Sequence, residues 1–213
     1  MLLLAIAASG GIATAWGAGS IASWGPMRGV VLLIAGVVGL YASAVLLFRA
    51  GLRAFPLEPG DIPVASREEF IYHVYQLSFL ILFYPVMRSG AVPVPLMRPF
   101  YLALGARLGA NTYSSGIIFD PGFVSIGRNS IVGQHALLVP HVNEGDRLAH
   151  FPIVVGDNVT IGAHAVIMSD VTIGNRAVIA AGAIVVKGTR IGAAEIWGGV
   201  PARRIGAVAK AAA

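Results

Sequence analysis

The sequence contains no cysteine and few charged residues. With no Cys among 213 residues, a disulfide framework is excluded, which agrees with a cytoplasmic compartment. Charged residues make up 12% of the chain and hydrophobic residues 56%, with a mean hydropathy of +0.78. This composition is too apolar for an ordinary soluble domain.

Asp and Glu are absent from the first 57 residues, which carry only three Arg. Two uncharged runs, residues 1–24 and 30–48, are each long enough for a helix to cross a hydrocarbon core of about 30 Å. The link at 25–29 is rich in turn residues and suits a hairpin. We therefore expect two transmembrane helices over residues 1–54. A cleaved signal peptide is the alternative for the first run, which lacks a basic n-region.

Basic residues predict the orientation of this hairpin. Arg49 and Arg53 follow the second run, so we expect a multi-pass protein of the inner (cytoplasmic) membrane, with the rest of the chain facing the cytoplasm. The net charge of +5 does not indicate nucleic acid, because the Arg residues are scattered without an aromatic–basic cluster. Attraction to anionic lipid headgroups accounts for it better.

Residues 55–106 are predicted to form interfacial or re-entrant amphipathic helices and a connector. Ser66 and Glu69 fit an N-cap and capping box that open a helix over 70–83, ended by Pro85. Polar side chains in its first half favour a shallow helix over a third span. Residues 92–99 are predicted to be a stiff connector, and 100–106 a short helix that caps the following domain.

An aliphatic residue recurs every six positions in the second half of the chain. A period of six excludes a helix, whereas a strand that turns a corner every six residues explains it. Three such faces close a coil of about 18 residues, and coils stack about 4.8 Å apart, which predicts a β-solenoid. The repeating residues are Leu108, Ile126, Val132, Leu138, Val155, Ile161, Ile167, Ile173, Ile179, Val185 and Ile191.

The six-residue period fails in two places. The first coil is irregular, because Ser114 and Asp120 occupy positions that should point inward. After Leu138 the period stops, and it resumes at Val155. Residues 140–153 are therefore predicted to leave the coil as a loop, and loops on rigid scaffolds commonly carry function. The solenoid domain is expected over 107–206, followed by a flexible tail at 207–213.

The stretch VTIGNRAVIAAGAIVVKGT, followed by WGGVPARRIG, resembles the hexapeptide-repeat acyltransferases, and its motifs are most similar to the sugar and xenobiotic acetyltransferase branch. The resemblance implies a homotrimer that uses acetyl-CoA or another acyl-CoA as donor, with no metal. The expected fold class is thus a membrane α-helical hairpin plus an all-β left-handed parallel β-helix, the hexapeptide-repeat solenoid.

The resemblance also implies a general base. His141 opens the segment that leaves the coil and matches the family's catalytic His, which deprotonates a hydroxyl or amine; histidine suits this task near neutral pH. The backbone N–H of Ala163 matches the group that polarises the thioester carbonyl. His135, Asn143 and Glu144 are candidates for acceptor binding. The alternative is that these polar residues are simply solvated.

Further residues are candidates for holding CoA. Small residues along the coils leave room for the pantetheine arm, although corner geometry alone also explains them. Basic residues near the C-terminal end are candidates for contacts with CoA and its phosphates, although a solvated tail explains them too. The candidates are Gly162, Ala181, Gly182, Lys187, Arg203 and Arg204. His164 is interpreted as an outward, structural residue.

The sequence does not identify the acceptor. Val142 stands where many sugar acetyltransferases have Pro, and apolar helices replace their soluble N-terminal segment, so we expect a lipid-linked or membrane-proximal acceptor. Two alternatives stay open: transfer from a carrier-protein thioester, and a non-enzymatic trimeric membrane scaffold. A γ-type carbonic anhydrase is disfavoured, because the spacings of His135, His141 and His164 do not suit its three-His site.

Overall fold

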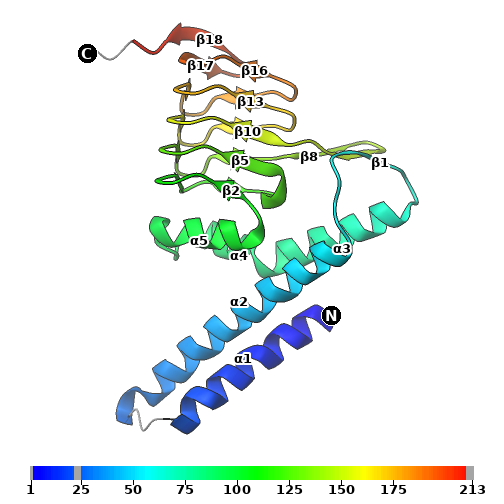
Figure 1. Ribbon diagram of the computed structural model, residues 1–213, viewed down its shortest axis with the longest axis vertical. Helices are drawn as coiled ribbons and strands as arrows, with labels where there is room; N and C mark the ends of the chain where they lie inside the picture. Colours follow the sequence, from blue (N-terminus) through cyan, green and yellow to red (C-terminus); the bar gives the residue numbers. More distant parts are fainter. Residues whose placement is uncertain (1, 22–24, 210–213) are drawn as a thin grey trace. The chain divides into compact units, whose positions relative to one another are not determined.

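The computed structural model describes residues 2–21 and 25–209, which form two compact units (Figure 1). The helical unit comprises Met1–Leu57 and His73–Pro85. The solenoid unit comprises Glu58–Tyr72 and Val86–Ala213. Helix α3 (Arg67–Leu82) contributes its first residues to the solenoid unit and its remainder to the helical unit.

Helices α1 (Leu2–Ile21) and α2 (Arg28–Ala54) of the helical unit pack closely through small residues. A Cβ atom on Gly10 would lie 2.0 Å from the Ser43 hydroxyl oxygen, and one on Gly39 would lie 2.3 Å from the Thr14 hydroxyl oxygen. Side chains other than hydrogen at these glycines would force the helices apart. Close approach through small residues is typical of helices that associate in membranes.

Two segments of the described chain, Gly25–Ala54 and Arg67–Ser89, are long and apolar enough to cross a membrane. The expected first span includes positions 1 and 22–24, which lie outside the described residues. The second segment contains α3 and α4 (Tyr84–Ser89), where the polar side chains had favoured a shallow helix. Length and composition alone support the spans, so the membrane hairpin stays a prediction.

The capping interactions expected at the start of α3 are present. The Glu69 N–H donates to the Ser66 hydroxyl at 3.0 Å. The Glu69 carboxylate in turn accepts from the Ala65 N–H at 2.5 Å, which is one residue earlier than the usual capping box. The helix ends at Leu82, and Pro85 lies in the first turn of α4, where its missing N–H costs least.

The solenoid consists of parallel strands arranged in three faces, as the period of six predicted (Figure 1). Val155 pairs with Ile173, and Ile173 with Ile191, so a regular coil takes three hexads. Face 1 contains β2 (Arg107–Leu108), β5 (Val124–Ile126), β10 (Ile153–Val155), β13 (Thr172–Ile173) and β16 (Arg190–Ile191); face 2 contains β3 (Tyr113–Ser114), β6 (Ile131–Val132), β11 (Thr160–Ile161), β14 (Val178–Ile179) and β17 (Glu195–Gly199); face 3 contains β4 (Ile117–Ile118), β7 (Leu137–Leu138), β12 (Val166–Ile167) and β15 (Ile184–Val185).

Two corner columns of the solenoid position the candidate site residues. The hairpin corner joins face 3 to face 1, at residues 119–123, 139–152, 168–171 and 186–189 of successive coils. The glycine corner joins face 2 to face 3, at residues 115–116, 133–136, 162–165 and 180–183. Inside, Ile161, Ile167, Ile173 and Ile179 are at most 1% exposed and form the stacked core that the period predicted.

A helix covers the first coil, but it is longer than the sequence suggested. Helix α5 (Val94–Leu104) includes most of the segment 92–99, so the prediction of a stiff connector there is wrong. Pro95 lies in its first turn, where proline is tolerated. The Tyr101 hydroxyl donates to the Gly116 carbonyl at 2.7 Å, and the ring is fully buried.

The last coil is covered by an antiparallel hairpin of β17 and β18 (Ala202–Ala207). Arg203 and Arg204 therefore lie in a strand, and Ala207, expected to begin the tail, ends that strand. Residues 210–213 lie outside the described residues. The Arg204 guanidinium lies 3.3 Å from the Glu195 carboxylate, and this ion pair joins β18 to β17.

The irregular first coil has a shortened glycine corner. Ser114 pairs with Val132, in step with the period, but Ile118 pairs with Leu138, the partner that the period assigned to Asp120. Ile118 therefore takes the inward position of face 3. Asp120 moves to the hairpin corner, where it is fully buried beside a short 3₁₀ turn, η2 (Pro121–Phe123).

The segment predicted as a loop at 140–153 is a β-hairpin. Strands β8 (His141–Glu144) and β9 (Arg147–His150) pair with each other, and β1 (Gly60–Ile62) pairs with the outer side of β9. Ile126 pairs with Val155, whereas a regular coil of three hexads would have paired it with Glu144. The inserted hairpin therefore moves the end of this coil from Glu144 to Val155. The hairpin extends sideways from the stack (Figure 1).

Replacing Ile173 tests the stacked core. Ile173→Asp should prevent folding of the solenoid, since it buries an unpaired charge. Ile173→Ala should lower the free energy of unfolding by about 2–5 kcal/mol. Thr172→Asp, which places the same charge on the outer side of the strand, should have a small effect. Denaturation followed by circular dichroism measures all three, and equal effects of Thr172→Asp and Ile173→Asp would contradict the assignment.

Candidate active site

The hairpin corner brings a histidine onto a buried carboxylate. The Nδ1 atom of His141 lies 2.5 Å from Oδ2 of Asp120, a hydrogen-bonding contact that is closer than the about 2.7–2.9 Å usual for a charge-assisted N–H···O bond. The Asp120 side chain is fully buried, while 18% of the His141 side chain is exposed. Because Nδ1 is engaged with Asp120, the Nε2 atom of His141 is the ring nitrogen available to a substrate. A histidine oriented by a carboxylate is an arrangement typical of a general base.

A second histidine lies beside the same carboxylate. His150 is the register partner of His141 in the hairpin, and its side chain is fully buried. Its Nε2 atom lies 3.9 Å from Oδ2 of Asp120. Burial lowers the pKa of His150 below the ordinary value, and this effect outweighs the attraction of Asp120.

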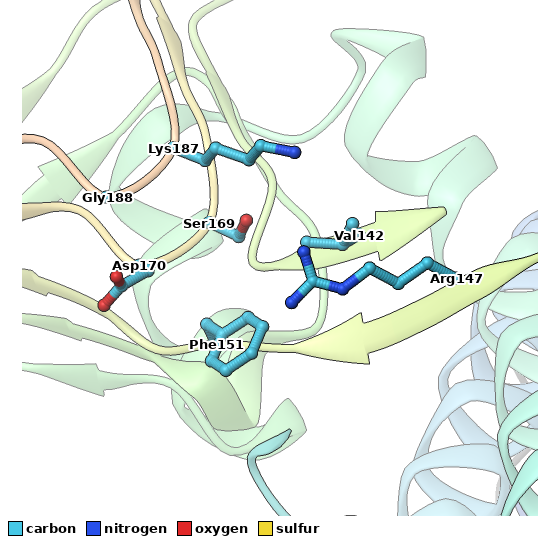
Figure 2. Close-up of a pocket in the computed structure, with 7 residues that line it drawn as sticks. All are labelled: Val142, Arg147, Phe151, Ser169, Asp170, Lys187 and Gly188. Carbon is cyan, nitrogen blue, oxygen red and sulfur yellow. The ribbon is translucent and has the colours of Figure 1, made fainter. Parts of the chain in front are cut away.

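A pocket of about 170 Å³ opens between the hairpin and the coils above it. Its lining residues come from the hairpin and from the coil corners. Figure 2 shows Arg147 and Val142 on the hairpin strands facing Ser169 and Lys187 on successive coil corners. Asp170, Phe151 and Gly188 complete the lining.

Ion pairs fix the hairpin to its surroundings. Lys187 Nζ lies 2.5 Å from the Glu144 carboxylate, and Arg147 Nε lies 2.7 Å from the Asp61 carboxylate in β1. These four side chains are about half exposed, so each pair adds little stability but sets the position of the strand ends. Glu144 and Lys187, predicted separately, are thus brought together, whereas Asn143 is exposed on β8 and does not join them.

Five of the other predicted residues lie at the glycine corner, one strand of face 3 away from His141 along the coil. His135, Gly162, Ala163, Ala181 and Gly182 stack there in three successive coils. A Cβ on Gly162 would lie 2.5 Å from the Ala181 nitrogen, and Gly182 has φ +70°, so corner geometry requires both glycines. No described residue accepts a backbone hydrogen bond from the Ala163 N–H.

His135 and His164 form an exposed pair on adjacent coils of this corner. Their ring centroids are 5.2 Å apart, and both residues adopt positive φ, 57° and 58°. His141 lies at the other corner, so the described residues include no group of three or more His, Asp or Glu side chains arranged to hold a metal ion. His164 is exposed, as predicted.

Comparison with known proteins identifies the repeat. Residues 152–187 match the family described as bacterial transferase hexapeptide (six repeats). Residues 152–187 of the solenoid are therefore hexapeptide repeats, and such repeats imply a left-handed coil.

The chain is also similar to individual proteins. The chain is 36% identical over 118 residues to galactoside O-acetyltransferase of Escherichia coli K12, covering 50% of this chain and 57% of that protein. It is 32% identical over 102 residues to γ carbonic anhydrase 1, mitochondrial, of Arabidopsis thaliana, covering 39% of this chain and 36% of that protein. The chain thus spans about half or less of the curated relatives it matches.

A solved structure shares the fold. A galactoside acetyltransferase in complex with coenzyme A matches with a TM-score of 0.50 and 22% identity, covering 76% of this chain and 91% of that chain. At this level of identity the likeness shows the fold of the hexapeptide domain.

Sequence reasoning missed Asp120 and His150 as site residues. Asp120 was noted only as a poor inward residue, because the shift of register in the first coil is not visible in the period. The only sequence feature that pointed to His150 was its position, because it is a second histidine shortly after His141 in the segment that leaves the coil. Pairing of the two across a hairpin requires the turn at Gly145, which has φ +58°.

The buried His150 makes stability depend on pH. Its pKa in the folded chain is lowered from an unfolded value near 6.5, so the unfolded chain binds more protons as the pH falls below that value. The free energy of unfolding should then fall by up to about 1.4 kcal/mol per pH unit. His150→Phe should flatten this dependence in thermal unfolding between pH 7 and 5, and His164→Asn should retain it. An unchanged slope in His150→Phe would contradict a neutral buried imidazole.

Proposed function

We propose that this chain is a membrane-anchored acyltransferase that moves an acyl group, in the simplest case acetyl, from CoA to a hydroxyl or amine of a lipid-linked or membrane-proximal acceptor. The observation that carries the proposal is the 2.5 Å contact between His141 Nδ1 and the buried Asp120 carboxylate. The similarity to galactoside O-acetyltransferase supports the acetyl donor and a hydroxyl acceptor.

In this proposal His141 moves one proton twice. Its Nε2 atom takes the proton of the acceptor hydroxyl or amine as the acceptor attacks the thioester carbonyl. The tetrahedral intermediate collapses with cleavage of the carbon–sulfur bond, and Nε2–H returns the proton to the departing CoA thiolate. Asp120 holds Nδ1–H throughout and stabilises the imidazolium that forms between the two steps. The Ala163 N–H is the proposed donor to the carbonyl oxygen.

The separation of the two corners supports a trimer. Ala163 and its neighbouring small residues lie at the glycine corner, while His141 lies at the hairpin corner of the same solenoid. The pocket of about 170 Å³ in one chain is also smaller than a usual small-molecule site of about 300–1,000 Å³. In a homotrimer the glycine corner of one subunit would face the hairpin of the next and complete the site. Lys187, Arg203 and Arg204 are the proposed contacts for CoA and its phosphates.

The helical unit supports a membrane-proximal acceptor. Helix α2 carries exposed apolar side chains along its length, including Leu33, Ile34, Val38 and Leu46. An apolar outer surface on a helix that is long enough to cross a bilayer is suited to lipid. We propose that the helices anchor the chain in the cytoplasmic membrane, with the hexapeptide domain on the cytoplasmic side where CoA is present.

Substitution of the His–Asp pair tests the proposed chemistry. Release of CoA from acetyl-CoA is followed with a thiol reagent, to which a chain without Cys contributes no background. His141→Ala should lower turnover by about 10²–10⁴, and Asp120→Asn should lower it strongly, since the amide no longer fixes the tautomer. Lys187→Ala should instead raise the KM for acetyl-CoA, and His164→Ala should change little.

The choice of acceptor tests the membrane-proximal part of the proposal. Octyl β-galactoside and methyl β-galactoside present the same hydroxyls with and without an apolar tail, and the octyl compound should be acetylated faster in lipid nanodiscs. Equal rates would contradict a membrane-proximal acceptor. The absence of acetyl transfer to any hydroxyl or amine tested would favour a carrier-protein donor or a scaffold.

The state of assembly tests the completed site. Native mass spectrometry in detergent should show three chains, and a mixture of His141→Ala and Ala163→Pro subunits should recover activity above either variant alone. Recovery follows because one interface of the mixed trimer combines an intact His141 with an intact Ala163 N–H. A monomer with full activity would contradict this arrangement.

A further inference from the structure

Three buried polar atoms beside the His–Asp pair have no partner. Among the described residues, Oδ1 of Asp120 and both ring nitrogens of His150 are buried and form no hydrogen bond. Buried polar groups without partners are uncommon, because each one loses its hydration without a replacement. All three belong to Asp120 and to the neighbouring His150, which indicates that the surroundings of this carboxylate are not an ordinary part of the core.

The ring of His150 is held in a fixed orientation. It stacks on Phe123 with the ring centroids 4.6 Å apart and the planes inclined by 4°. Tyr72 packs edge-on against it, with the centroids 5.0 Å apart. His150 also lies on the central strand β9, between Gly60 of β1 and His141 of β8. The stack with Phe123, the contact with Tyr72 and strand pairing on both sides of β9 leave the ring little freedom other than a small tilt.

The orientation directs Nε2 of His150 toward the oxygen that holds His141. The distance from this nitrogen to Oδ2 of Asp120 is 3.9 Å, compared with 2.5 Å from His141 Nδ1. The longer distance exceeds a hydrogen bond, but a shift of less than about 1 Å would bring the two atoms into range. A neutral imidazole carries one N–H, and a proton on Nε2 would be the second donor to Asp120.

A second hydrogen-bond donor would help to compensate the burial of the Asp120 carboxylate. The carboxylate of Asp120 is fully buried, and a buried carboxylate is costly unless several hydrogen bonds compensate it. His141 alone supplies one bond, and it gains a positive charge and loses it again during the proposed reaction. A donor that stays neutral and does not react would keep the carboxylate in place through both steps.

We propose that His150 is a positioning residue, which donates from Nε2–H to Asp120 and so keeps the carboxylate of Asp120 aligned on Nδ1 of His141. This role rests on the proposed function of His141 as the general base. His150 does not touch the substrate; it acts through Asp120. Strand pairing on both sides of β9 and the contact with Tyr72 also hold His150, so its position does not depend on Phe123 alone.

Three substitutions separate the donor from the packing. His150→Phe keeps a flat ring against Phe123 but removes the N–H, and His150→Gln restores an N–H without the ring. Phe123→Leu is the matched control, since it loosens the stack and keeps His150. Circular dichroism checks folding, and His150→Leu replaces His150→Phe if the latter does not fold.

The first readout is the hydrogen bond itself and needs no substrate. The chain has five His, so nitrogen NMR of protein labelled only in histidine resolves each ring, with His141→Gln to assign the signal. The wild type, His150→Gln and Phe123→Leu should show His141 protonated on Nδ1, with a far-downfield proton bound to Asp120. In His150→Phe the signal of this proton should lose intensity through exchange with water, and the tautomer of His141 that is protonated on Nε2 should appear.

The second readout is acetyl transfer to octyl β-galactoside. His150→Phe should lower kcat by about 10- to 100-fold, the range for residues that orient a functional histidine, with the KM for acetyl-CoA unchanged and partial rescue in His150→Gln. An unchanged His141 signal in His150→Phe, or equal losses in Phe123→Leu, would overturn the proposal. Wild-type protein with the NMR signal but no acetyl transfer would instead count against the proposed function.

Discussion

The structure depends on one constraint: aliphatic side chains must stack in columns, one from each turn of the coil. Val155, Ile173 and Ile191 lie directly above one another in parallel strands, and each is at most 4% exposed. Full burial of such a side chain contributes about 1.5–3 kcal/mol, and the hydrogen bonds between coils allow little sliding. Because every face is fixed in register, the corners between faces are fixed as well, and polar residues at corners are held in defined columns.

The candidate site forms at the hairpin corner, where the effects of two irregularities in neighbouring coils meet. A shortened glycine corner in the first coil moves Asp120 from the core to the hairpin corner. An insertion in the next coil places His141 and His150 opposite each other in a hairpin above it. Neither irregularity would create a site alone, since a buried carboxylate without a partner is unstable and a hairpin histidine without Asp120 has no fixed tautomer.

The helical unit follows a different principle. Its helices approach closely through Gly10 and Gly39, and its outward surfaces carry large apolar side chains. Water would not favour such a surface, whereas in lipid small-residue packing is an effective way for helices to associate. Strand β1 belongs to the solenoid unit and follows α2 in the chain after a short link. It pairs with β9, so it directly supports the hairpin that carries His141.

The sequence by itself determined the solenoid, the apolar helices, the N-cap at Ser66 and the departure of the chain from the coil after Leu138. These features rest on local patterns: a period of six, uncharged runs and a capping residue, each of which acts over a few neighbours. The same reasoning was wrong at residues 92–99, because their prolines suggested a connector, whereas Pro95 lies in the first turn of α5 and Pro99 lies within the helix. The pairings among Asp120, His141 and His150 were decided only by the tertiary structure. They depend on a shift of register between coils and on the register of a hairpin, and both arise from contacts between strands that are separated along the chain, which no local pattern records.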